Sequence, residues 1–185
     1  MRILAISGSL RRESQNTMLL RAAAELLPAG VELDFYEGLR DVPPYDGDHD
    51  VEPAPTEVAA LRAAVADADA VLISTPEYNS SIPGTLKNAL DWASRPMATS
   101  SFRSKPVGVI GSSAGMFGAV WAQAELRKVL AAMGARVADV EVAVGRASEK
   151  FDADGRLIDE EIREQLRDAV EVLVAEVATE PALAG

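Results

Sequence analysis

The sequence TPEYNSSIPGTLKNALDW, residues 75–92, carries the clearest structural signal in the chain. It follows a short apolar run, Ala70 to Ser74, whose β-branched residues are typical of a strand buried in a parallel sheet. Pro76 removes a backbone donor and ends this strand, and Pro83 favours the start of a helix. The polar loop Glu77 to Ile82 therefore joins a strand to a helix. Ligands bind at such loops in open parallel sheets, although an ordinary strand–helix connection has the same pattern.

The composition narrows the classes of protein to consider. The 185 residues favour one domain spanning residues 1–185, with a tail from about residue 179, because domains hold roughly 100–200 residues. The absence of cysteine excludes disulfides and thiolate catalysis. The one histidine, His49, lies among Asp and Pro residues, which excludes a His-rich zinc site and disfavours a Ser-His-Asp hydrolase. We expect no metal site.

The net charge of −11 argues against nucleic acid and anionic membranes as partners, because both are bound through basic patches. The sequence has no apolar run of 18 residues, and its first residues lead directly into a strand pattern instead of a signal peptide. We therefore expect a cytoplasmic protein.

A second polar loop follows the first apolar run, Ile3 to Ile6, and precedes a helical pattern that begins near Leu19. It contains four hydroxyls, an amide and two arginines: Ser7, Ser9, Ser14, Thr17, Asn16, Arg11 and Arg12. Hydroxyls and arginines beside the free N–H groups of a helix start can bind phosphate. Neither a G-x-G-x-x-G fingerprint nor a Walker loop is present. A simpler reading is that Ser14 or Asn16 caps the helix, and the two roles are compatible.

The remaining pattern alternates strands and helices. Further strands are predicted at 31–36, 107–110 and 137–144, and helices from about 56, 84, 120 and 158. Residues 38–56 form a long irregular loop, which is typical of a functional or mobile segment. Residues 152–155 superficially resemble a calcium loop but are better explained as a turn.

Five strands separated by helices predict an α/β doubly wound parallel sheet, in which strand order 2-1-3-4-5 is natural. This order places the loops after strands 1 and 3 on one crevice. A glycine-rich loop after strand 4, residues 111–118, lies beside them. Its glycines indicate either close approach to a flat ligand or turns that need positive φ.

The three loops resemble those of the NADPH-dependent FMN reductase family, flavodoxin-like enzymes that include quinone, azo-dye and chromate reductases. The matching blocks are GSLR (8–11) with Ser14 and Asn16, PEYN (76–79) through PG (83–84) and LKNALDW (86–92), and GSS (111–113) with Gly115 and Gly118. The middle block is the most specific. Together the blocks span residues 1–135.

The resemblance implies a cofactor-binding set in three groups. The FMN phosphate is expected at Ser9, Arg11, Ser14, Asn16 and Thr17; the edge and face of the flavin ring at Pro76, Glu77, Tyr78 and Asn79; and its pyrimidine end at Ser112, Ser113 and Gly115. The family pattern favours Arg11 over Arg12 at the phosphate, without deciding between them. No catalytic side chain is expected, because flavin carries its own reactivity.

The resemblance therefore implies an FMN-dependent NAD(P)H oxidoreductase, with NADPH or NADH as cosubstrate. Its acceptor would be a quinone, an azo compound, a metal oxyanion or free flavin. One alternative is a flavodoxin-type electron carrier that docks onto a protein partner, and another is a binding module for a phosphate ligand.

The family is typically dimeric or tetrameric, so a homo-oligomer is expected. We expect an exposed Trp92 and its helix to take part in this self-association, because Trp92 lies beside the core stripe of the helix and an exposed tryptophan suits the centre of an interface. The alternative is that Trp92 packs beneath the loop 38–56 or against the flavin loop.

Overall fold

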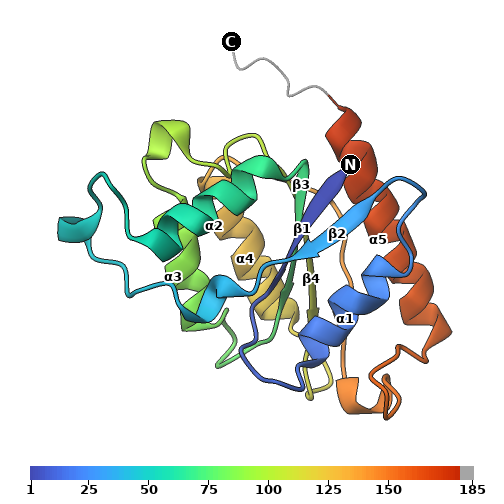
Figure 1. The fold of residues 1–185 in the computed structure, drawn as a ribbon. Helices are drawn as coiled ribbons and strands as arrows, with labels where there is room; N and C mark the ends of the chain where they lie inside the picture. The colour runs from blue at the N-terminus through green and yellow to red at the C-terminus, as the bar shows by residue number, and fades with distance from the viewer. Residues whose placement is uncertain (180–185) are drawn as a thin grey trace.

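The computed structural model describes residues 1–179 and contains one parallel β-sheet (Figure 1). Its main strands are β1 (Arg2–Ser7), β2 (Glu32–Phe35), β3 (Ala70–Thr75) and β4 (Pro106–Ser112). The order β2-β1-β3-β4-β5 confirms the prediction. The carboxyl ends of β1 and β3 are adjacent, because Ser7 pairs with Ser74. The loops that follow these two strands therefore begin side by side.

Helices cover both faces of the sheet (Figure 1). One face carries α1 (Gln15–Ala24) and α5 (Glu160–Ala178). The other carries α2 (Thr56–Asp67), α3 (Gly84–Ala93) and α4 (Val120–Ala132). Short 3-10 segments add η1 (Gly38–Arg40), η2 (Gly47–His49), η3 (Met97–Thr99) and η4 (Ala147–Glu149).

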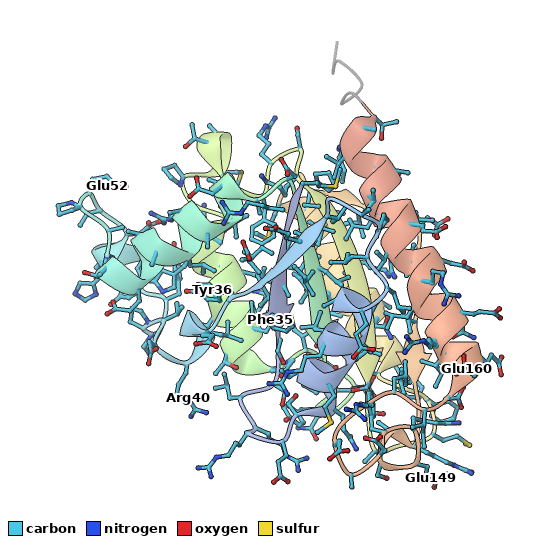
Figure 2. All side chains as sticks on the ribbon, turned by 45° about the vertical axis from the view of Figure 1, so that its right-hand side comes forward. Phe35, Tyr36, Arg40, Glu52, Glu149 and Glu160 are labelled. Carbon is cyan, nitrogen blue, oxygen red and sulfur yellow. The ribbon has the colours of Figure 1, made fainter. Side chains whose placement is uncertain are left out.

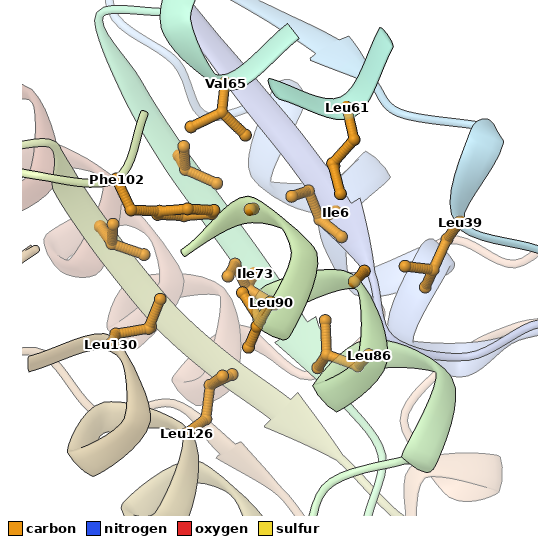
Figure 3. Close-up of a cluster of buried hydrophobic side chains, with 14 of the residues drawn as sticks. Ile6, Leu39, Leu61, Val65, Ile73, Leu86, Leu90, Phe102, Leu126 and Leu130 are labelled. Carbon is orange, nitrogen blue, oxygen red and sulfur yellow. The ribbon is translucent and has the colours of Figure 1, made fainter. Parts of the chain in front are cut away.

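The alternation of side chains along β1 explains the two layers of core. Leu4 and Ile6 point into the cluster beneath α2, α3 and α4, which Figure 3 shows. Ile3 and Ala5 belong to the cluster beneath α1 and α5. Since successive residues of a strand face opposite sides, a strand that is apolar at every position is buried on both.

The fifth strand differs from the prediction of one strand over 137–144. Two short strands, β5 (Arg136–Val137) and β6 (Ala143–Val144), both pair with β4. Between them, the guanidinium group of Arg127 donates hydrogen bonds to the carbonyls of Val109 (3.1 Å) and Ala138 (2.9 Å). This side chain satisfies backbone acceptors where the ladder is interrupted. Burial lowers the pKa of Arg127.

The expectation of an exposed Trp92 is wrong. Its side chain is 1 % exposed, and its Nε1 donates a hydrogen bond to the carbonyl of Pro43 (2.8 Å). The ring of Tyr45 meets it edge to face at 4.9 Å. Asn88, one turn earlier on α3, accepts from the backbone N–H of Tyr45 and donates to the carbonyl of Pro43. Trp92 therefore packs beneath the loop 38–56 and, with Asn88, anchors it.

The last part of the chain follows the predicted pattern. Asp152 to Gly155 is a turn, closed by a hydrogen bond from the Gly155 N–H to the Asp152 carbonyl. The side chain of Asp159 caps α5 by accepting from the N–H of Ile162. Of the predicted tail from about residue 179, all but Thr179 lies outside the described residues. Across residues 1–179, no helix has both the length and the apolar character needed to cross a membrane.

Candidate functional site

The three loops predicted to converge enclose one cavity of about 330 Å³. It lies at the carboxyl ends of the strands, where β1, β3 and β4 give way to loops. Ten of the twelve predicted cofactor residues line it: Ser9, Arg11, Ser14, Asn16, Pro76, Glu77, Tyr78, Ser112, Ser113 and Gly115. Gln15 and Ala114, which the sequence reasoning omitted, line it too. Thr17 and Asn79 do not.

The loop after β1 is closed by its own hydroxyl groups. Ser14 is the N-cap of α1, and its Oγ accepts the N–H of Thr17 at 3.2 Å. The hydroxyl of Thr17 donates to Ser7 Oγ at 2.9 Å, which directs it away from the cavity. The first-turn N–H groups of Gln15 and Asn16 have no intrahelical acceptor, because helix starts lack one. This end of α1 therefore presents backbone donors and a partial positive charge to an anion.

Asn16 connects this loop to the neighbouring strands. It is 4 % exposed, and its Oδ1 accepts hydrogen bonds from the Ser112 N–H (3.0 Å) and the Ser74 hydroxyl (2.8 Å). Its Nδ2 donates to the Ser112 carbonyl (3.1 Å). Most of its hydrogen-bonding capacity is thus used within the protein. Asn16 sets the relative position of the loops after β1 and β4.

Two features of the loop after β4 fit a bound ring system. The hydroxyl of Ser112 is buried and has no hydrogen-bond partner within the described residues, although such groups are normally paired. A side chain added at Gly115 would approach only Ser113 Oγ, at 3.6 Å. Protein packing therefore does not demand glycine there, and the backbone leaves room for a ligand to approach closely.

The loop after β3 contains a tight reversal. Tyr78 and Ser81 exchange backbone hydrogen bonds of 3.0 and 3.1 Å. The two residues between them, Asn79 and Ser80, both have positive φ (54° and 59°), which is the pattern of a two-residue hairpin turn. Asn tolerates this conformation better than most residues. Asn79 is at the turn and outside the lining of the cavity.

Glu77 links the loop after β3 to α4. Its Oε2 accepts hydrogen bonds from the backbone N–H groups of Trp121 and Ala122, both at 3.1 Å. The N-cap residue of α4, Ala119, has no side-chain oxygen to offer. A carboxylate from another loop therefore caps this helix and complements its dipole. No local pattern predicts this pairing, because the two segments are more than 40 residues apart in the sequence.

Exposed apolar side chains surround the same region. They come from the loops after β3 and β4 and from the start of α4: Tyr78, Met116, Phe117 and Trp121. Phe117 and Trp121 pack edge to face with ring centroids 5.1 Å apart. Sequence reasoning assigned the exposed tryptophan to Trp92, but it is Trp121. We call these four residues the aromatic rim.

The two arginines of the first loop are in different positions. Both side chains are exposed, but Arg11 lines the cavity and Arg12 does not. The cavity thus combines a cation, free backbone donors and hydroxyls at one end. At the other end it has small residues and an unpaired hydroxyl. A planar ligand with a phosphate group matches this distribution.

Comparison with known proteins supports a flavin site. The family model described as NADPH-dependent FMN reductase matches residues 1–149. An NAD(P)H-dependent FMN reductase of Pseudomonas aeruginosa is 39% identical, covering 93% of this chain and 92% of the relative. A 2-hydroxy-1,4-benzoquinone reductase of Burkholderia sp is 40% identical, covering 90% of this chain and 91% of the relative.

A solved structure is also similar. FerB, a flavoenzyme NAD(P)H:(acceptor) oxidoreductase from Paracoccus denitrificans, superimposes with a TM-score of 0.85 at 35% identity. The match covers 96% of this chain and 97% of FerB.

Proposed function

The chain belongs to the NADPH-dependent FMN reductase family, and on that premise we propose that it is an NAD(P)H:quinone oxidoreductase with FMN in the cavity described above. The protein is a flavin-dependent reductase, and its relatives at about 40% identity are named as FMN and quinone reductases. The observation that carries the proposal is the convergence of the loops after β1, β3 and β4 on one cavity.

FMN, when bound, supplies the redox chemistry, by accepting a hydride from a nicotinamide and passing electrons to a second substrate. The chain binds and orients it. Arg11 and the first-turn N–H groups of α1 hold the phosphate, with Ser9 beside them. Ser112, Ser113 and Gly115 meet the pyrimidine end of the ring, where N–H groups stabilise negative charge. Pro76 and Tyr78 border the ring.

Four of the residues expected to bind the cofactor have a structural role in the geometry, because they shape the cavity through hydrogen bonds and turns: Asn16, Glu77, Thr17 and Asn79. Asn16 and Glu77 fix the loops relative to one another through their hydrogen bonds. Thr17 closes the loop after β1, which we call the phosphate loop, and Asn79 forms the turn of the loop after β3. Each of these residues acts on FMN through the shape of the cavity.

A quinone suits the surroundings of the cavity. The aromatic rim offers flat apolar surfaces to a small planar acceptor. Quinone reductases recur among the relatives, including one of Escherichia coli at 39% identity. The alternative of an electron carrier that docks onto a protein has no support from these relatives, which are named as reductases.

We further propose that the protein is a homodimer or homotetramer and that the aromatic rim takes the place of Trp92 at the interface. All four members are about half exposed or more: Met116 (63 %), Phe117 (54 %), Tyr78 (52 %) and Trp121 (49 %). Apolar patches of this kind on a soluble protein commonly mark contact surfaces. A partner copy on this rim would narrow the opening of the cavity.

The acceptor is tested by steady-state kinetics across a panel of a benzoquinone, an azo dye, chromate and free FMN, with NADPH and NADH in parallel. We expect kcat/KM for the quinone to exceed that of every other acceptor by at least tenfold. An azo dye, chromate or free FMN that equals the quinone would contradict the assignment of the acceptor. That result would leave the assignment of the FMN site unchanged, because it concerns only the second substrate.

A further inference from the structure

A second cavity of about 370 Å³ lies on the other side of the phosphate loop. It is bounded by that loop, the end of β2, η1 and the side of α1. It shares only Ser9 and Arg11 with the flavin cavity. The volume falls within the range of roughly 300–1,000 Å³ that is usual for small-molecule sites. The proposed binding of FMN leaves this space unused.

Three arginines line the second cavity: Arg11, Arg21 and Arg40. None of them takes part in an ion pair between described residues. Arg40 is held in place because its guanidinium donates to the carbonyl of Leu10 at 2.7 Å. In a chain of charge −11, three guanidinium groups without carboxylate partners around one hollow indicate an anionic ligand.

Aromatic side chains stand beside these cations. Figure 2 labels Phe35, Tyr36 and Arg40 where the chain leaves β2 and enters η1. Phe35 is 38 % exposed and borders the cavity, so its ring is available for stacking on a planar group. Burial, followed by the charges of Asp41 and Glu57, raises the pKa of Tyr36, so its hydroxyl is a neutral donor.

Glu37 gives the cavity a third kind of group. Glu37 is one of the lining residues, and its negative charge would repel a simple anion. In nucleotide-binding parallel sheets, an acidic residue beyond the second strand accepts hydrogen bonds from ribose hydroxyls, next to the phosphate loop after the first. Glu37 follows β2, which is the neighbour of β1. Ring, ribose and phosphate would thus each have a matching group.

We propose that the second cavity binds an adenosine phosphate group, with its ring on Phe35, its ribose on Glu37 and its phosphate on Arg21 and Arg40. This rests on the proposed function, because the nicotinamide cosubstrate of that reaction carries such a group, whereas FMN does not. The group has two sources to distinguish. One is the AMP half of FAD bound in place of FMN, whose linked phosphates would pass Arg11 from one cavity to the other. The second is the ADP half of the nicotinamide cosubstrate.

The test is calorimetric titration of the FMN-loaded protein with ADP. FMN already fills the flavin cavity in this protein, so ADP can report only on the second cavity. We expect one ADP per chain. Arg21→Ala and Phe35→Ala should each weaken its binding at least tenfold. Arg12→Ala is the matched control, because Arg12 is exposed and lines neither cavity, and it should leave ADP binding unchanged.

Absence of saturable ADP binding at millimolar concentration would overturn the proposal, as would equal affinity in Arg21→Ala, Phe35→Ala and the parent. Retained FMN stoichiometry shows that each variant is folded. Reduction of the flavin by NADPH is measured separately. If the protein binds ADP but NADPH does not reduce its flavin, the result contradicts the proposed reductase function and leaves the proposed ADP site intact.

Two further measurements distinguish the sources. If the group belongs to FAD, flavin-free protein binds FAD at least tenfold more tightly than FMN, Phe35→Ala removes the difference, and FAD-loaded protein no longer binds ADP. If it belongs to the cosubstrate, FAD and FMN bind equally, and ADP competes with NADPH or NADH. Phe35→Ala then raises the KM for that nucleotide at unchanged kcat. Failure of both patterns would overturn the assignment to a redox cofactor.

Discussion

Asn16 and Ser112 are joined by two hydrogen bonds across 96 residues of sequence. The Ser112 N–H donates to Asn16 Oδ1 at 3.0 Å, and Asn16 Nδ2 donates to the Ser112 carbonyl at 3.1 Å. The side-chain amide thus pairs with the backbone as a neighbouring strand would. It connects the loop that would hold the phosphate to the loop that would hold the ring.

Replacing Asn16 with Ala should therefore destabilise the flavin-free protein. The buried N–H and carbonyl of Ser112 lose their partners, at a cost on the order of 2 kcal/mol or more in the free energy of unfolding. Urea denaturation measures this. Gln15→Ala is the control, since Gln15 is adjacent and makes no side-chain hydrogen bond among the described residues. If Asn16→Ala retains full stability and loses only FMN affinity, Asn16 is a phosphate ligand instead.

Arg11→Ala should weaken FMN binding by about 1.5–3 kcal/mol, the range for a hydrogen bond to a charged group. Riboflavin, which lacks the phosphate, should bind equally to the variant and the parent. Fluorescence titration of flavin-free protein with both ligands gives the comparison. Arg12→Ala should change neither affinity. Equal losses for FMN and riboflavin would show that Arg11 supports the loop instead of the phosphate.

Gly115 and Gly118 should respond differently to alanine. At Gly115 the new Cβ has room in the flavin-free protein, so unfolding stability should stay within about 0.5 kcal/mol while FMN affinity falls. At Gly118, which has φ of +59°, the Cβ would lie 2.3 Å from the backbone of Ala143. That variant should be destabilised even without flavin. Thermal unfolding measures the stability of both variants, and titration with FMN measures their affinity. An unchanged FMN affinity in Gly115→Ala would contradict close contact between FMN and the backbone at Gly115.

The sequence predicted the sheet well because its inner strands are buried on both faces. Runs such as 70–74 and 107–110 are apolar at nearly every position, and few other structures accommodate them. The strand order followed from the count of strands, and the convergence of the loops followed from that order.

The errors have a common physical origin. The alternation over 137–144 did not reveal that Arg127 would satisfy the carbonyls of Ala138, in this segment, and of Val109, on β4. The helical position of Trp92 did not reveal that a loop 49 residues earlier in the chain would cover it. In the same way, Glu77 caps a helix that begins beyond residue 119. Each contact joins distant segments, which local patterns cannot predict.

Trp121→Glu tests the proposed self-association. A charge in the aromatic rim should convert the oligomer to monomers of 19.6 kDa, measured by light scattering at micromolar concentration. Trp92→Glu is not a suitable probe, because Trp92 is buried and the variant would unfold locally. Parent protein that is already monomeric at that concentration would contradict the proposal.

The proposed reaction has two halves, in which NAD(P)H reduces the bound FMN and the reduced FMN passes electrons to a quinone. Anaerobic stopped-flow mixing measures both halves, by following the flavin absorbance of the FMN-loaded protein. We expect NADPH or NADH to bleach the flavin band within seconds, and a benzoquinone added to the reduced protein to restore it without nucleotide present. A flavin band that neither nucleotide bleaches within minutes, or that the quinone fails to restore, would contradict the account.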